Sequence, residues 1–94
     1  MTLTPGRFIS YEYDRMVVLF SMRDGAREIP CAVSTSAMDE MEGVVRAASS
    51  QREAQFIRLR ERIEACADGK YRATELEGTP PGIILRSIDF RKPR

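Results

Sequence analysis

Histidine is absent from this sequence of 94 residues. Its absence removes the commonest general base, the commonest metal ligand and the usual base partner of a serine or cysteine nucleophile. The chain also contains no phosphate-binding loop, no G-x-G-x-x-G or G-x-S-x-G motif, and no cluster with the spacing of metal ligands. We therefore expect no enzymatic activity, no cofactor and no metal site.

Cysteines and long apolar runs are also scarce. Cys31 and Cys66 form no C-x-x-C motif, and they are typical of small buried thiols in a reducing cytoplasm. A disulfide would require their Cα atoms to lie within about 7 Å, and a catalytic thiol would require a group that lowers its pKa. No apolar run approaches the roughly 18 residues of a membrane helix, and residues 1–6 lack a signal-peptide stretch. We expect a cytoplasmic protein without a membrane partner.

Neither sign of charge is in large excess. Fifteen basic and fourteen acidic side chains give a net charge of +1, which argues against a dedicated nucleic-acid binder. Residues 1–45 carry four basic and seven acidic side chains (−3), whereas residues 46–94 carry eleven and seven (+4). Such halves can attract each other within one chain or across a dimer. The composition predicts one folded domain over residues 1–94, with frayed ends at 1–6 and 91–94.

Three strands are expected in the first third of the chain, at residues 8–13, 16–22 and 27–34. The Asp24-Gly25 pair is a turn signal between the second and third strands, so the three form an antiparallel meander. The apolar residues share one face if a four-residue loop, 23–26, sets the register. The expected facing pairs are Phe20 with Ile29, Val18 with Cys31, and Met16 with Val33. Because Pro30 has no N–H, we expect the third strand to be a sheet edge there, or bulged.

The middle of the chain is expected to hold two helices. The first begins after the possible caps Ser34, Thr35 and Ser36, is weakened by Gly43, and ends at 47–49. The second begins with a capping box formed by Ser50 and Glu53 and ends at Gly69. Its apolar residues form a single stripe at helical spacing, namely Phe56, Leu59, Ile63, Cys66 and Ala67.

A last strand is expected over residues 82–90, which are rich in isoleucine and leucine. The order of elements is then βββααβ. This order indicates an α+β fold, in which an antiparallel sheet of about four strands packs against two helices.

The order and spacing of several residues are also familiar. These residues are Ser10, Tyr11, Asp14, Val18, Phe20, Asp24, Gly25, Glu28, Ile29, Phe56, Arg60, Ile63, Ala67, Tyr71, Asp89 and Phe90. With this pattern, the chain from Phe8 to Phe90 resembles a family of short proteobacterial proteins, the domain of unknown function DUF1488. The resemblance implies a bacterial, cytoplasmic protein of one domain, and it implies no activity.

Arginine, with thirteen copies against two lysines, supplies the candidate binding residues. Arg58 and Arg62 lie on one face of the second expected helix, and the tail adds Arg91, Lys92 and Arg94; together they suit phosphate or nucleic acid. The competing interpretation is a solvated helix face laced with ion pairs. Arg60 and Asp89 are expected to form a structural ion pair.

The acids Asp39, Glu40 and Glu42 suit a helix start better than a metal site, and the tyrosines are interpreted as core or rim residues rather than base-stacking ones. We therefore expect a small interaction module or accessory factor that pairs with itself or with a protein partner at an exposed edge strand. The alternative is weak nucleic-acid binding through the arginine-bearing helix and tail.

Overall fold

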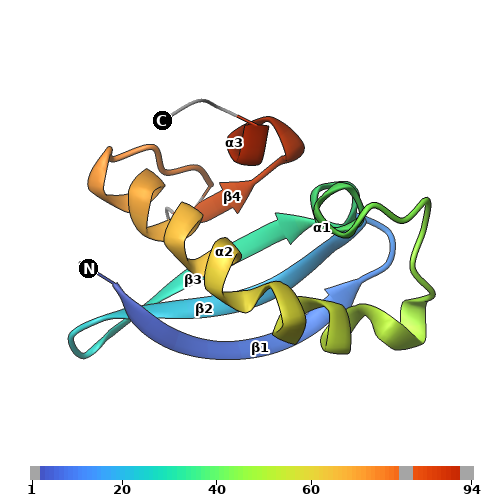
Figure 1. Ribbon diagram of the computed structural model, residues 1–94. Helices are drawn as coiled ribbons and strands as arrows, with labels where there is room; N and C mark the ends of the chain where they lie inside the picture. Colours follow the sequence, from blue (N-terminus) through green and yellow to red (C-terminus); the bar gives the residue numbers. More distant parts are fainter. Residues whose placement is uncertain (1–2, 79–81, 92–94) are drawn as a thin grey trace.

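The computed structural model describes residues 3–78 and 82–91 (Figure 1). Its elements are β1 (Thr4–Glu12), β2 (Val17–Asp24), β3 (Arg27–Ser34), α1 (Thr35–Glu42), a 3₁₀ turn (Ser49–Gln51), α2 (Arg52–Arg72), β4 (Ile83–Leu85) and α3 (Ser87–Arg91). The four strands form one sheet in the order β1-β2-β3-β4. The α+β class, the N-terminal meander and the two main helices are confirmed. The sheet is mixed rather than wholly antiparallel, because β4 runs parallel to β3.

The β2–β3 hairpin has a tighter turn than expected. Only Gly25 and Ala26 separate the strands, so Phe20 faces Cys31 and Val18 faces Val33, a shift of two positions from the predicted register. Gly25 has a φ of 61° at the first loop position, where a type II′ turn requires glycine. Because the shift is even, the predicted apolar residues stay on one face. The third apolar residue of β2 on that face is Met22, which faces Ile29, and not Met16 as we expected.

Strand β3 lies between β2 and β4, and its ladder with β2 has no bulge, but at Pro30 itself β3 has no β4 partner among the described residues, as the prediction of a sheet edge at this residue expects. The ladder between β3 and β4 begins only at Cys31, one residue beyond Pro30. Pairs in an antiparallel hairpin alternate, so Ser21–Pro30 is a non-hydrogen-bonded pair, three steps from the pair that flanks the turn. The missing N–H of Pro30 therefore points toward a position where β4 has not yet begun to pair.

Helix α1 ends earlier than the apolar spacing suggests. Its N-cap is Ser34, whose hydroxyl accepts a hydrogen bond from the N–H of Ala37 (3.0 Å), as the sequence predicts. It ends at Gly43, which has a φ of 68° and begins a Schellman motif, with Val44 N–H bonded to the Asp39 carbonyl (3.0 Å). The predicted end at 47–49 is therefore wrong, because Gly43 terminates the helix instead of weakening it.

Helix α2 differs from expectation at both ends. It has no side-chain cap, so the predicted capping box of Ser50 and Glu53 is wrong, and a 3₁₀ turn leads into the helix instead. It continues through Gly69 to Arg72, and Thr74, with a φ of 56°, takes the left-handed position after it. The predicted apolar stripe is confirmed: Phe56, Leu59, Ile63 and Ala67 join the inward faces of the strands in one core.

The C-terminal segment is a short strand followed by a helix, not the single strand predicted over residues 82–90. The side chain of Asp89, in the first turn of α3, accepts the N–H of Arg86 (2.8 Å). This bond is half of a capping box and satisfies a backbone donor that a continued strand would have paired elsewhere. Phe90 then packs against the core from the same side as α1.

Candidate protein-interaction surface

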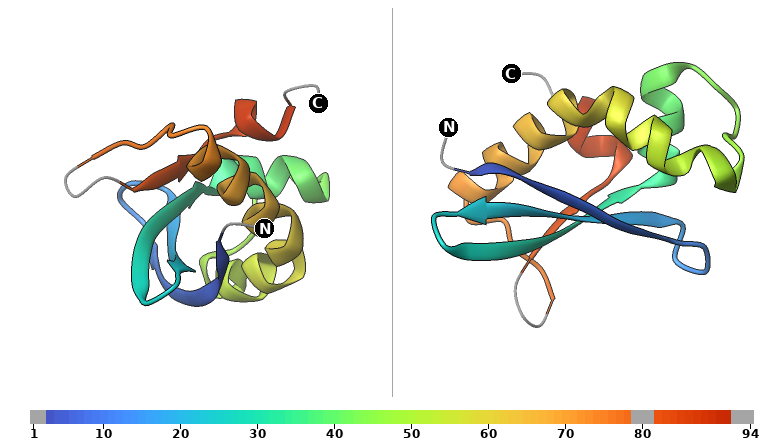
Figure 2. Two further views of the ribbon diagram at one scale, coloured as in Figure 1. Left: turned by 90° about the vertical axis from the view of Figure 1, so that its left-hand side faces the viewer. Right: turned by 90° about the horizontal axis from the view of Figure 1, so that it is seen from below.

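The sheet is covered on one face only. Helices α1 and α2 lie on its concave side, and within residues 3–78 and 82–91 no helix covers the opposite, outer face (Figure 2). Leu19, Ala32 and Ile84 are register partners across β2, β3 and β4, so they form an apolar row on this outer face. Because side chains alternate between the two faces of a strand, the same alternation that fills the core also produces this row.

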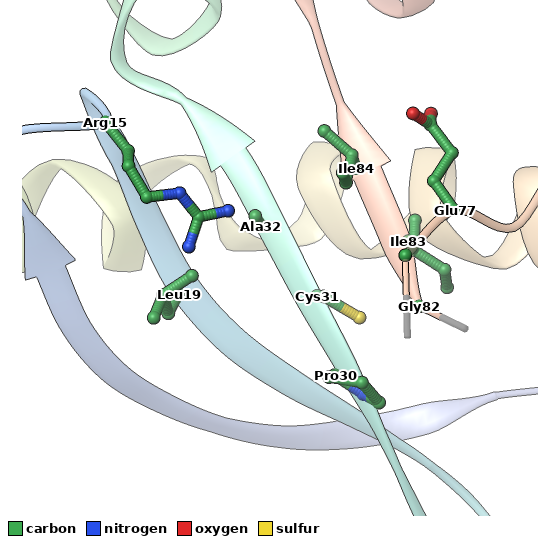
Figure 3. Close-up of a pocket in the computed structure, with 10 residues that line it drawn as sticks. Arg15, Leu19, Pro30, Cys31, Ala32, Glu77, Gly82, Ile83 and Ile84 are labelled. Carbon is green, nitrogen blue, oxygen red and sulfur yellow. The ribbon is translucent and has the colours of Figure 1, made fainter. Parts of the chain in front are cut away.

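A groove of about 260 Å³ lies over this row. Its lining is mostly apolar, and the residues that form it are Arg15, Leu19, Pro30, Cys31, Ala32, Glu77, Gly78, Gly82, Ile83 and Ile84. The charged residues Arg15 and Glu77 lie on opposite sides of the apolar row (Figure 3). We call Leu19, Pro30, Ala32 and Ile84, with Arg15 and Glu77 at their margins, the outer groove.

Arg15 and Glu77 differ in how they are paired. Figure 3 shows the Arg15 side chain reaching over the sheet toward Ala32, and no carboxylate of the described residues lies within ion-pair distance of it. Glu77 binds Arg86 through two contacts (2.9 and 3.0 Å), and its side chain remains 40% exposed. The outer groove therefore has an uncompensated positive charge at one margin and an accessible carboxylate at the other.

The two edges of the sheet are partly blocked by side chains of α2. Beside β1, Arg60 donates to the carbonyl of Gly6 (2.7 Å), and Asp68 accepts the N–H of Leu3 (2.7 Å). On β4, the ammonium of Lys70 donates to the carbonyl of Ile84 (2.9 Å). Because these backbone groups are already bound, an incoming strand cannot use them, which makes both edges poorer docking sites than the open face.

The predicted pair of Arg60 with Asp89 is not formed, because each side chain has another partner. Arg60 binds Glu64 one turn along α2 (2.7 Å), whereas Asp89 lies 3.3 Å from the ammonium of Lys70. The guanidinium of Arg60 also lies 5.8 Å from the ring centre of Phe56, where its stem covers the end of the core. Both residues are structural, but they secure different ends of the domain.

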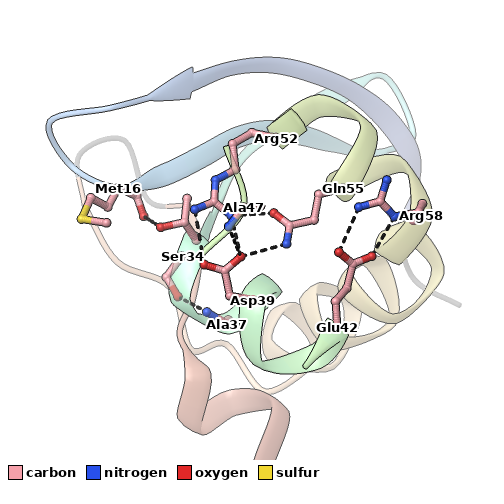
Figure 4. A network of polar contacts seen from close by, with 10 residues as sticks. Met16, Ser34, Ala37, Asp39, Glu42, Ala47, Arg52, Gln55 and Arg58 are labelled. Atoms are coloured by element: carbon pink, nitrogen blue, oxygen red, sulfur yellow. Dashed lines mark hydrogen bonds and ion pairs between the residues drawn. The ribbon is translucent and has the colours of Figure 1, made fainter. Parts of the chain in front are cut away.

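The acids of α1 each bind an arginine from the basic half of the chain. Asp39 binds Arg52 (2.7 Å), Glu42 binds Arg58 (2.8 Å; Figure 4), and Glu40 binds Arg91 (3.3 Å). Two of the arginines that we singled out for phosphate, Arg58 and Arg91, are thus already neutralised. Arg62 is exposed on α2, and Lys92 and Arg94 lie outside the described residues.

Arg52 was not singled out from the sequence, yet it is the largest fully buried side chain. Its guanidinium binds both oxygens of Asp39 and the amide oxygen of Gln55 (2.7 Å; Figure 4). It also lies 5.8 Å from the ring centre of Tyr11. Its Nε has no partner within the described residues. The signal was present in the sequence, because Arg52 precedes Phe56 by four residues and so lies on the buried stripe of α2.

The burial of Asp39 would raise the pKa of its carboxyl, but the hydrogen bonds from Arg52 and Gln55 outweigh this effect and lower that pKa below its ordinary value. Burial raises the pKa of the Cys31 thiol to about 12, so this thiol is not a nucleophile near neutral pH. Within the described residues, no three side chains are placed to hold a metal ion, and no helix is long and apolar enough to cross a membrane.

The tyrosines lie where the core-or-rim interpretation places them. Tyr11 and Tyr71 pack against the core, and the Tyr71 hydroxyl donates to Asp24 (2.6 Å). Tyr13 is 62% exposed in the turn after β1, and its ring contacts that of Tyr11. They form no continuous stacking platform of the kind that binds single-stranded nucleic acid.

The chain is similar to one solved structure and to one described family. A crystal structure of a protein of unknown function from the DUF1488 family of Shewanella loihica PV-4 matches with a TM-score of 0.73 and 14% identity, over 90% of this chain and 93% of that one. At that identity the likeness shows the fold alone. No curated protein matches the sequence. The family described as "protein of unknown function (DUF1488)" matches residues 5–84, and the chain belongs to this family.

Proposed function

We propose that this chain is a small, non-catalytic protein-interaction module that works in the cytoplasm and binds through the outer groove. The observation that carries the proposal is an apolar sheet face which the described helices leave uncovered, with a charged residue at each margin. Leu19 and Ile84 are partly exposed on this face and Ala32 is buried between them, and a partly exposed apolar row with charged residues at its margins favours association. The buried thiol of Cys31 supports the cytoplasmic location.

The open face fits this role better than the sheet edges or the arginines of α2. Lys70 and Arg60 occupy backbone carbonyls of the two edge strands, so pairing with a partner strand would first have to displace them. Arg58 and Arg91 bind carboxylates, which lowers the positive potential that a phosphate backbone would need.

The proposal is tested by capture from cells that express a tagged copy beside the untagged chain, with nuclease added. Wild-type protein is expected to retain one partner in near-stoichiometric amount, and Ile84→Glu, which puts a charge in the outer groove, is expected to lose it. The matched control is Ile57→Glu, on the exposed side of α2, where the wild-type isoleucine is already 50% exposed.

Mass spectrometry identifies the retained partner. Equal capture by wild type and Ile84→Glu would refute the groove as the binding surface, provided that both variants show the far-ultraviolet spectrum of the wild type. Loss of all bound material on nuclease treatment would refute the proposal in favour of nucleic-acid binding through the arginines and the tail.

A further inference from the structure

The two margins of the outer groove carry charges of opposite sign, so the groove can be complementary to the same groove of a second copy. Arg15 lies at the β2 side of the apolar row, and Glu77 lies beyond β4 on the other side (Figure 3). A two-fold axis that lies in the interface plane, perpendicular to the direction from Arg15 to Glu77, exchanges the two margins, so a second copy related by this axis brings Arg15 of each chain to Glu77 of the other. One symmetric contact then forms the same charge pair twice around an apolar centre.

We infer that the outer groove is occupied by a second copy of this chain, in a two-fold symmetric dimer. This inference rests on the proposed function and names its partner. Leu19 and Ile84 are the partly exposed members of the apolar row, and those of one sheet face those of the other at the dry centre of the interface, above the buried Ala32. Two sheets that pack face to face in this way form a sandwich with the helices on the outside.

Both charged residues at the margins of the groove can form an ion pair with the second chain. Arg15 has no carboxylate partner within the described residues, so it gains one without giving up another. Glu77 keeps its contacts with Arg86, and since a carboxylate has about four acceptor positions, it can accept a second guanidinium. Glu40 and Glu42 of α1, by contrast, are bound to arginines of the same chain.

The test is a charge exchange between two variants. R15E and E77R each place like charges at both contacts of the dimer, so each is expected to raise the dimer dissociation constant at least about tenfold relative to wild type. An equimolar mixture of the two variants restores an acid opposite a base at both contacts. The mixture is therefore expected to form a heterodimer with an affinity near that of the wild type, measured by sedimentation equilibrium.

The controls use exposed residues away from the groove margins. R62E and E61R change the same charges on the exposed side of α2, at positions whose side chains have no ion-pair partner in the described part of the chain, so they should leave dimerisation unchanged, alone or mixed. R86A removes the existing partner of Glu77 and shows whether loss of that surface pair alone affects association.

Two outcomes would overturn the inference. Wild-type protein of monomer mass at concentrations up to about 1 mM would show that no dimer of useful affinity exists. A dimer that is equally weakened by R15E alone and by the mixture would show that the two residues do not meet across the interface. If the wild type is monomeric but Ile84→Glu still loses a captured protein, the proposed function stands and only the identity of the partner is wrong.

Discussion

Removal of the Arg52 guanidinium should destabilise this protein much more than removal of the Arg58 guanidinium. Both arginines belong to α2 and both bind an acid of α1, so Arg52→Met and Arg58→Met are matched changes. They differ in burial: the side chain of Arg52 is 2% exposed, whereas that of Arg58 is 53% exposed.

The expected magnitudes follow from that difference. Arg52→Met leaves the Asp39 carboxylate buried without its cation, which costs about 3–5 kcal/mol of unfolding free energy. A domain of this size has about 5–14 kcal/mol in total, so the loss is a large fraction of it. Arg58→Met breaks an exposed ion pair, which solvent screens and which therefore contributes little to the unfolding free energy.

The pH dependence gives a second, independent readout. The pKa of folded Asp39 lies below its ordinary value of 3.8, so the ionised carboxylate contributes stability above that pH and loses it as the pH falls through the folded pKa. Arg52→Met loses the part of this contribution that comes from Arg52, whereas the hydrogen bonds from Gln55 and the Ala47 N–H remain. The difference in unfolding free energy between wild type and Arg52→Met should therefore be largest near pH 7 and narrow in strong acid.

Urea unfolding followed by far-ultraviolet circular dichroism at pH 7 and at about pH 3 measures both effects. The reasoning is refuted if Arg52→Met lies within about 1 kcal/mol of Arg58→Met, or if its deficit is the same at the two pH values. A triple variant, R52M/D39L/Q55L, should recover most of the loss, because it leaves neither a buried charge nor a buried amide at this position in the core.

Three further predictions concern the fold. Gly43→Ala should lower the free energy of unfolding in urea by about 1 kcal/mol, because φ is positive at that position. Gly69→Ala, inside α2 with open space for the added Cβ, should raise it by a similar amount. A change in the same direction for both variants would contradict this account. Lys70→Met removes the cation that binds Asp89 and the Ile84 carbonyl, so amide exchange should accelerate in residues 83–91 before it does in β1–β3; uniform acceleration would argue against a local role. In a Cys66→Ser background, Cys31 should react with Ellman's reagent at pH 8 only as fast as the protein unfolds, and rapid labelling of the native state would disprove its high pKa.

The sequence predicts the strands well because their apolar alternation is local. Val18, Phe20, Cys31 and Val33 all face the core as expected. The register was wrong by two positions because an even shift leaves the same residues inside, so the pattern cannot distinguish the two alternatives. Only the turn distinguishes them, and the choice of Gly25 as its first residue depends on backbone geometry that composition does not reveal.

Helix ends and the C-terminal segment were predicted less well because contacts distant in sequence decide them. Glycine was expected to end α2 at Gly69, but Thr74 adopts the left-handed conformation instead, and the helix gains a last turn that carries Lys70. Lys70 in turn binds Asp89, which is 19 residues away and caps α3. The apolar pattern alone predicts a strand here, because it contains neither the local bond between Asp89 and Arg86 nor the contact by which Lys70 of α2 holds Asp89.

The acidic and basic halves of the chain form ion pairs with each other within one molecule, and the position of these pairs explains why Arg15 has none. Three arginines of the basic half each bind an acid of α1, namely Arg52, Arg58 and Arg91. The attraction between the two halves that the composition predicts therefore holds α1 against α2 and α3. Arg15 belongs to the acidic half and lies on the other side of the sheet, where α1 cannot reach it. Arg15 thus keeps an unpaired charge on the outer face, where the dimer that we infer would bring Glu77 of the second copy to it.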